Sequence, residues 1–217
     1  MRFGIYELYN LIQPGFRQRR IKLFIQLFKP SKDTRILDVG GFVYDWEDVV
    51  PIESPVTLLN LYHPPPKNLA SRYKLEIGDG RKLKYSDQSF DIAYSNSVIE
   101  HLPTFEDQQQ FADELRRVGR QVFVQTPNRW FFIESHFLTV FVHYLPWRIA
   151  RKLIRFCSFR GFFRSGDNVN LNQLARELRL LDYKKMQTLF PDCEIHREKW
   201  FGFTKSLIAI RHDFQPQ

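Results

Sequence analysis

Several short apolar runs of this chain end in small or polar residues, which are the types that can hold a ligand where a strand ends. The first run, Arg35 to Val39, contains Asp38 and is followed by Gly40 and Gly41. Glycine lets the backbone approach a ligand closely, and open α/β sheets bind their ligands at the carboxyl ends of the strands. The pattern predicts a ligand-binding glycine turn, although a glycine turn after any parallel strand would look the same.

Three later runs end in a similar way. Asn60 lies near the end of Val56 to Leu61, the sequence Gly78-Asp79-Gly80 follows Tyr73 to Ile77, and Ser95-Asn96-Ser97 follows Phe90 to Tyr94. Carboxylate, amide and hydroxyl groups at these points can accept and donate hydrogen bonds to a polar ligand. We therefore expect these four run ends to share one edge of a sheet.

His101, just after the fourth run, is the nearby residue that titrates near neutral pH. It is a candidate general base for removing a proton from a substrate. The alternative is that Glu100-His101-Leu102 begins a helix and that His101 only packs or forms a hydrogen bond there.

The rest of the chain supplies the elements that would position these residues. Residues 2 to 29 have a helical apolar pattern with a break at Pro14-Gly15, and residues 105 to 118 form a predicted helix with acidic residues in its first turn and Arg116 and Arg117 in its last. Alternation of strands and helices favours a parallel sheet. The remaining predicted elements are a strand at 121–125, a helical stretch at 130–156, a helix at about 171–181, and strands at 193–199 and 206–211.

The run ends resemble motifs of class I S-adenosylmethionine-dependent methyltransferases, in particular the small-molecule group called type 11. Its first motif reads approximately [DE]-x-G-x-G, which Asp38 and Gly40 match, whereas Phe42 stands at the usual second glycine. Residues 89 to 102 resemble the block around the family's fourth strand, and this is the most specific match. The resemblance covers nearly the whole chain.

This resemblance implies a role for each run end. Gly40 and Gly41 would approach the methionine part of the cofactor, and Asp38 would organise that turn or bind the amino group. Asn60 stands where the family has an acidic residue that binds the ribose, so ribose binding would be weaker or shared with Tyr62. Asp79 and Gly80 would bind adenine, and Ser95 and Asn96 would open onto the cofactor.

The implied fold is a Rossmann-like three-layer α/β/α sandwich. Its mostly parallel seven-stranded sheet would have an antiparallel last strand. We expect one domain over residues 1–217, with an N-terminal helical segment at 1–30 and a helical lid or acceptor insertion at 127–170.

Methyl transfer from a sulfonium is an in-line displacement, so the protein chiefly aligns the acceptor, excludes water and, where needed, removes a proton. The predicted acceptor pocket consists of polar and aromatic residues near this edge: Ser97, Asn128, Arg129, Trp130 and His136. A helical cap over the core is the alternative for the segment after residue 126. Small-molecule, saccharide and lipid-linked acceptors all fit the sequence.

The chain has a formal net charge of +8 and a pI near 9.5, which favours an anionic partner. Basic residues at 148, 151, 152 and 155 have helical spacing beside apolar ones, so they form either an amphipathic helix on an anionic membrane or a solvated basic face. Nucleic-acid methylation is a less favoured alternative, because the run at Ser95 lacks the Asp/Asn-Pro-Pro-aromatic motif. A methyltransferase-like binding protein without catalysis is a further alternative, suggested by Phe42 and Asn60.

Other classes find little support. The two cysteines, Cys157 and Cys193, form no CxxC or zinc-spaced cluster, so we expect no disulfide framework and no metal. The N-terminus lacks a secretory pattern, and the most lipophilic stretch, 131–145, is too short to span a bilayer and contains Glu134 and two histidines. We expect a cytoplasmic protein, with peripheral membrane contact as a further option.

Overall fold

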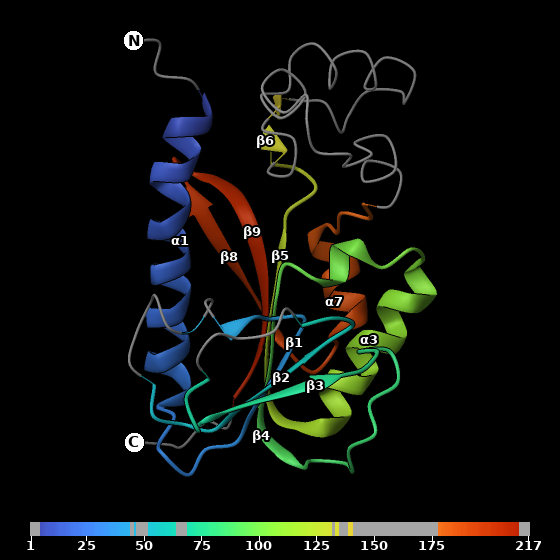
Figure 1. Cartoon of the computed structure of the whole chain (residues 1–217). Coiled ribbons are helices and arrows are strands. Elements are labelled where there is room, and N and C mark those ends of the chain that lie inside the picture. The colour runs from blue at the N-terminus through green and yellow to red at the C-terminus, as the bar shows by residue number, and fades with distance from the viewer. Residues whose placement is uncertain are drawn as a thin grey trace, which may run out of the picture.

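The computed structural model describes residues 5–43, 46, 52–63, 69–131, 133–134, 139–140 and 178–212. Its main sheet has seven strands in the order β3-β2-β1-β4-β5-β9-β8 (Figure 1). The strands are β1 (Ile36–Val39), β2 (Val56–Asn60), β3 (Tyr73–Ile77), β4 (Phe90–Asn96), β5 (Gly119–Pro127), β8 (Glu194–Trp200) and β9 (Phe203–Arg211). β9 is antiparallel to both of its neighbours, and the first five strands pair in parallel. The predicted fold class is confirmed.

The register of the parallel strands brings their carboxyl ends together. Asp38 of β1 pairs with Leu58 of β2 and with Tyr94 of β4, and Asn60 of β2 pairs with Ile77 of β3. The chain order turns at β1 and β4, which lie side by side but lead away in opposite directions across the sheet. In a doubly wound sheet this switch point is where ligands bind.

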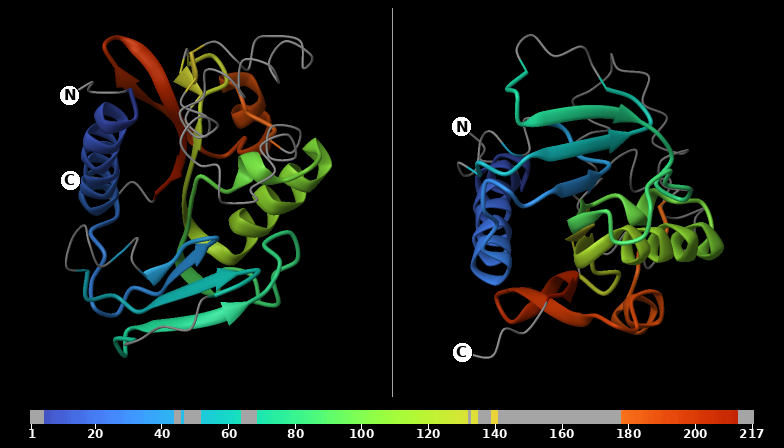
Figure 2. Two further views of the ribbon diagram at one scale, coloured as in Figure 1. Left: turned by 45° about the horizontal axis from the view of Figure 1, so that its top comes forward. Right: turned by 90° about the horizontal axis from the view of Figure 1, so that it is seen from below.

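Helix α1 (Ile5–Phe28) covers one face of the sheet (Figure 2). Its Phe24 is fully buried, and the ring contacts Trp46, Tyr94 and Phe123 edge-on at 5.5–5.9 Å between centroids. The predicted break at Pro14-Gly15 is wrong, because α1 runs through both residues without interruption. Proline removes one N–H donor from a helix, and in a helix of 24 residues the remaining backbone hydrogen bonds and the packing of its apolar face outweigh that loss.

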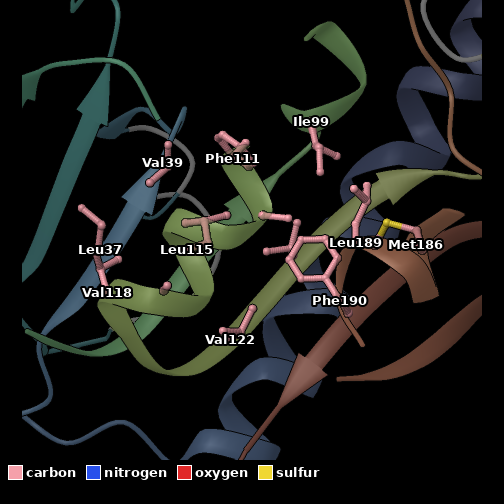
Figure 3. Close-up of a cluster of buried hydrophobic side chains, with 14 of the residues drawn as sticks. Leu37, Val39, Ile99, Phe111, Leu115, Val118, Val122, Met186, Leu189 and Phe190 are labelled. Carbon is pink, nitrogen blue, oxygen red and sulfur yellow. The ribbon is translucent and has the colours of Figure 1, made fainter. Parts of the chain in front are cut away.

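Helices α3 (Phe105–Val118) and α7 (Tyr183–Leu189) cover the opposite face. The Thr104 hydroxyl accepts from the Asp107 amide and the Asp107 carboxylate accepts from the Thr104 amide, a reciprocal capping box that fixes the start of α3. Figure 3 shows side chains of both helices meeting those of the central strands in one apolar cluster. The sheet is therefore buried on both sides, as parallel strands require.

The last third of the chain differs from the predictions. Residues 133–134 (β6) and 139–140 (β7) form a short antiparallel pair, so the predicted helix at 130–156 is wrong there, and the rest of that stretch lies outside the described residues. Of the predicted helix at 171–181, residues 178–180 have no regular secondary structure and Leu181 forms a bridge to Asn128, so the prediction is wrong there, and the remainder lies outside the described residues. Helix α7, which begins after Asp182, was not predicted. Within the described part of the chain, no helix is long and apolar enough to cross a membrane.

Candidate functional site

The turn after β1 requires glycine at its first position. Gly40 has φ of +90°, and its amide donates to the Leu59 carbonyl of β2 at 2.7 Å. A Cβ atom on Gly40 would lie 2.3 Å from a methyl of Val98, on the loop after β4. The backbone at residue 40 is therefore held between β2 and the β4 loop, in a conformation that other residues rarely adopt.

Gly41 makes room for the carboxylate of Asp38. Asp38 is buried in β1, and its Oδ2 accepts a 2.7 Å hydrogen bond from the indole Nε1 of Trp46. A Cβ atom on Gly41 would lie 1.8 Å from the same Oδ2. The missing side chain at 41 thus lets the carboxylate lie against the turn, so that Asp38, Gly41 and Trp46 form one unit.

Asn60, at the end of β2, braces this glycine turn. Its Nδ2 donates to the Gly40 carbonyl at 3.0 Å, and its Oδ1 accepts from the Leu61 amide at 2.8 Å. An amide group has two donor hydrogens and two acceptor lone pairs, so Asn60 retains capacity for a ligand hydroxyl. Beside it, Leu61, Tyr62 and Ile77 expose most of their side chains, which gives the ends of β2 and β3 an apolar surface next to a polar one.

Asp79 follows β3 and is bound by Arg81. The guanidinium donates to both carboxylate oxygens at 2.6–3.1 Å and also reaches Asp107 at 2.6 Å. Hydrogen bonding by Arg81 lowers the pKa of the Asp79 carboxyl, so Asp79 is ionised at neutral pH. Next to it, a Cβ atom on Gly80 would lie 2.6 Å from the Phe111 ring, so this glycine permits close packing of the loop on α3.

The polar residues at the end of β4 lie in different environments. The buried Ser95 hydroxyl donates to the Val39 carbonyl at 2.8 Å and so connects β4 to β1. Ser97 has φ of +57°, and its hydroxyl donates to Oε1 of Gln125 at 2.9 Å. Asn96 is half-buried between them, and His101 is exposed at the end of a short 3-10 helix, Ile99–His101. The structure therefore brings Asp38, Gly40, Ser95 and Asn96 to one switch point and leaves His101 on the surface.

The predicted acceptor residues after β5 are only partly described. The buried side chain of Asn128 donates to the Thr204 carbonyl at 2.8 Å and holds the turn against β9. Arg129 and Trp130 are exposed, with the guanidinium 5.6 Å from the centre of the indole ring. His136 lies outside the described residues. The acceptor pocket therefore stays a prediction.

Comparison with known proteins finds a family model that matches part of this arrangement. Residues 54–121, from before β2 to the start of β5, match the family model described as a methyltransferase domain. The resemblance to class I methyltransferases of the type 11 group is confirmed. No curated protein matches the sequence at a significant level.

Solved structures share this fold at low identity. A chain named as Zn-dependent alcohol dehydrogenase from Rhodobacter sphaeroides is 13% identical, with a TM-score of 0.53 over 97% of this chain and 98% of that one. A chain described as an exported protein of Bordetella parapertussis is 10% identical, with a TM-score of 0.59 over 93% of this chain and 67% of that one. Phosphoethanolamine N-methyltransferase 2 of Haemonchus contortus, in complex with S-adenosyl-L-methionine, is 12% identical, with a TM-score of 0.54 over 82% of this chain and 38% of that one. At such identities, and with such different names, these likenesses show the fold alone.

Three residues of the candidate site were not predicted. Trp46 binds Asp38, Arg81 binds Asp79, and Gln125 binds Ser97. Arg81 could have been anticipated, since an aspartate commonly accepts from the amide two residues later, as Asp79 does from Arg81 at 2.9 Å. Gln125 reaches the site from β5 and Trp46 from the segment between β1 and β2, and no local pattern indicates them.

Proposed function

We propose that this protein transfers a methyl group from S-adenosylmethionine to a small-molecule, saccharide or lipid-linked acceptor. The observation that carries this proposal is the glycine turn at β1, with Gly40 at positive φ, next to the polar ends of β2 and β3 in a sheet of class I order. The methyltransferase-domain match over residues 54–121 supports it. We place the reaction in the cytoplasm, in keeping with the small number of cysteines.

The residues present fit such a cofactor. Because Gly40 and Gly41 have no side chains, Val98 and the Asp38 carboxylate pack directly against the turn, which holds its backbone in a fixed conformation at the switch point. The partly exposed carboxylate of Asp79 and the exposed Ile77 side chain offer a polar and an apolar contact of the kind that an adenine ring needs. Asn60 retains hydrogen-bonding capacity for the ribose. When bound, S-adenosylmethionine supplies an electrophilic methyl group.

The chain's own contribution is alignment of the acceptor and, where the acceptor carries a proton, its removal. Ser95 ties β4 to β1 and so fixes the distance between the glycine turn and the β4 loop. Ser97 is fixed in turn by Gln125. A rigid frame of this kind favours the in-line geometry that displacement requires.

Replacement of Asp79 with alanine is expected to weaken S-adenosylmethionine binding about tenfold, the worth of one charge-assisted hydrogen bond. Isothermal titration calorimetry on the full chain measures the affinity directly. Asp113→Ala is the matched control, because Asp113 is an exposed acid that also pairs with an arginine, Arg116 at 3.0 Å. Unchanged affinity in Asp79→Ala would remove Asp79 from the cofactor site.

A second variant separates direct contact from loop support. Arg81→Ala leaves the Asp79 carboxylate in place but removes its bridge to Asp107. If Asp79 contacts the cofactor, Arg81→Ala retains more affinity than Asp79→Ala. If both variants lose the same affinity, the bridge and not the carboxylate is what binding requires.

His101 remains the candidate general base. Incubation of the protein with methyl-labelled cofactor and cell extract identifies the acceptor, and turnover of His101→Ala is then measured with it. A base role predicts that the variant turns over more slowly while its cofactor affinity is unchanged. It also predicts that wild-type turnover falls as the pH is lowered and the imidazole is protonated. Full turnover by the variant shows that the exposed imidazole has no such role.

A catalytically inactive binding protein is the second candidate function. It is favoured because Asn60 already forms a hydrogen bond with Gly40, and Asp79 with Arg81, so that both side chains have fewer groups left for a cofactor. Calorimetry separates the candidates at the first step. Absence of binding would favour the scaffold function, whereas binding with no labelled product from any extract would favour a sensor of the cofactor.

A further inference from the structure

The loop between β8 and β9 displays a phenylalanine at its tip. Trp200 pairs with Phe203, so the hairpin loop has two residues, Phe201 and Gly202. Both have positive φ, 46° and 83°, as a type I′ turn requires. Phe201 exposes 85% of its surface, the largest value among the exposed large hydrophobic residues of the described chain.

Phenylalanine is a poor choice for this position on grounds of folding. Type I′ turns favour asparagine, aspartate or glycine at the first position, because these residues tolerate the left-handed region. A bulky residue there is an outlier, and such strain is usually retained at functional sites. The Phe201 ring lies 5.2 Å from the Trp200 ring, yet 85% of the residue stays exposed, so its side chain is better explained by a contact outside the chain.

Two further aromatic side chains are exposed near this tip. Phe203 begins β9, and Trp130 lies in the turn after β5; each is 61% exposed. The neighbouring Trp200 packs on the body of the protein, with its ring 6.4 Å from Phe16 of α1 and 6.0 Å from Phe131. We call Trp130, Phe201 and Phe203 the tip patch. The hairpin that carries it reaches up beside α1 in Figure 1.

Among the residues that the structure describes next to the tip patch, the exposed charges are positive. Arg129 lies over the Trp130 ring, Lys199 precedes Trp200, and Arg19 lies over Phe16 at 5.6 Å. Between residues 195 and 206 the one acid is Glu198, which is buried against Arg20, and residues 8–28 of α1 contain none. A partner that meets this surface must therefore accept aromatic rings and balance positive charge.

We propose that the tip patch docks the protein onto the surface of an anionic lipid bilayer. Exposed aromatic rings at a turn insert at the boundary of headgroups and acyl chains, where their apolar bodies leave water. Flanking arginine and lysine side chains are attracted by the negative potential of anionic lipids. The proposal does not depend on the methyltransferase activity or on the undescribed basic segment at 148–155.

Phe201→Asn tests this proposal with little risk to folding, because asparagine is favoured at this turn position. The full chain is sedimented with vesicles of phosphatidylcholine alone and with vesicles that also contain phosphatidylglycerol. We expect wild-type binding only to the second kind, weakening with added salt. Phe201→Asn is expected to bind them about tenfold more weakly, through loss of one inserted aromatic ring.

Leu69→Asn is the matched control, since Leu69 is an exposed apolar residue before β3, away from the hairpin. It is expected to bind vesicles like the wild type, and the melting temperature of Phe201→Asn is expected to equal or exceed that of the wild type. Equal vesicle binding by all three proteins, or none by the wild type, overturns the proposal. The proposal is also overturned if the wild type does not bind vesicles and has a larger apparent mass than Phe201→Asn in size-exclusion chromatography. That result would favour contact between two copies of the chain.

Discussion

Alanine at position 41 is expected to lower the affinity for S-adenosylmethionine by on the order of a hundredfold, without unfolding the protein. The added Cβ would lie 1.8 Å from Oδ2 of Asp38, so the carboxylate must turn away from Trp46 or the glycine turn must move. Overpacking at a buried position costs about 1–3 kcal/mol, which at its upper end corresponds to this loss if the strain falls on the binding turn. Calorimetric titration measures it.

Gly15→Ala is the control for Gly41→Ala. Gly15 lies inside α1, and a Cβ atom there would meet nothing within 4 Å. Alanine is the better helix former by about 1 kcal/mol, so this variant should be more stable than the wild type and bind the cofactor equally well. If Gly41→Ala also binds normally, the turn at β1 does not contact the cofactor, and the proposed site is wrong at its centre.

The sheet could be predicted well because its strands are short apolar runs bounded by polar or glycine residues. The boundaries of β2, β3 and β4 differ from the predictions by no more than two residues, and β1 by one. The strand order is not contained in those runs, and the resemblance to a known family supplied it. Local patterns of residues thus determine which segments form strands. Which strands lie next to each other in the sheet depends on contacts across the whole chain.

Helices were harder to predict where one local signal opposed tertiary packing. Proline and glycine predicted a break in α1, but the packing of Phe24 and its neighbours holds the helix along the sheet. Helix α7 has seven residues, too few for a clear apolar period. Its signal was the N-cap residue Asp182, whose carboxylate accepts from the Lys185 amide at 2.9 Å.

The candidate site shows the same division. Types and order of residues indicated Asp38, Gly40 and Asp79, because these lie at strand ends. Trp46, the partner of Asp38, could not be read in this way, and neither could Asp107, which α3 brings to Arg81 beside Asp79. The Asp38 and Asp79 carboxylates already accept hydrogen bonds from Trp46 and Arg81, so any ligand must share these carboxylates with them.

Away from the site, a buried cluster of charges joins α1 to the last hairpin. Arg20, Glu198 and Lys205 each expose less than a tenth of their surface, and the Arg20 Nε lies 3.7 Å from Glu198. The Lys205 ammonium lies 3.9 Å from the centre of the Phe16 ring. Two cations therefore share one buried anion, which is an unfavourable balance. Burial lowers the pKa of Lys205 to about 8, from 10.5.

Lys205→Met should therefore stabilise the protein, by about 2 kcal/mol near pH 7. There the lysine is charged in both states, and its charge is costly only when it is buried. As the pH rises from about 8 to 10.5, the folded state loses its proton first, so wild-type stability rises and the advantage of the variant disappears. Burial raises the pKa of Cys193 to about 12, so its thiol opposes this rise above about pH 9. Since Cys193 is present in both proteins, its effect cancels in their difference.

Denaturant unfolding of both proteins between about pH 7 and pH 10 measures that difference. Lys199→Met is the control, because Lys199 is an exposed lysine of the same hairpin, and it should change stability by no more than about 0.5 kcal/mol at any pH. A Lys205→Met variant that is less stable than the wild type at pH 7 would mean that the contact of the ammonium with the Phe16 ring and its attraction to the Glu198 charge outweigh the cost of its burial. In that case Lys205 would stabilise the packing of the hairpin on α1, and would not weaken it.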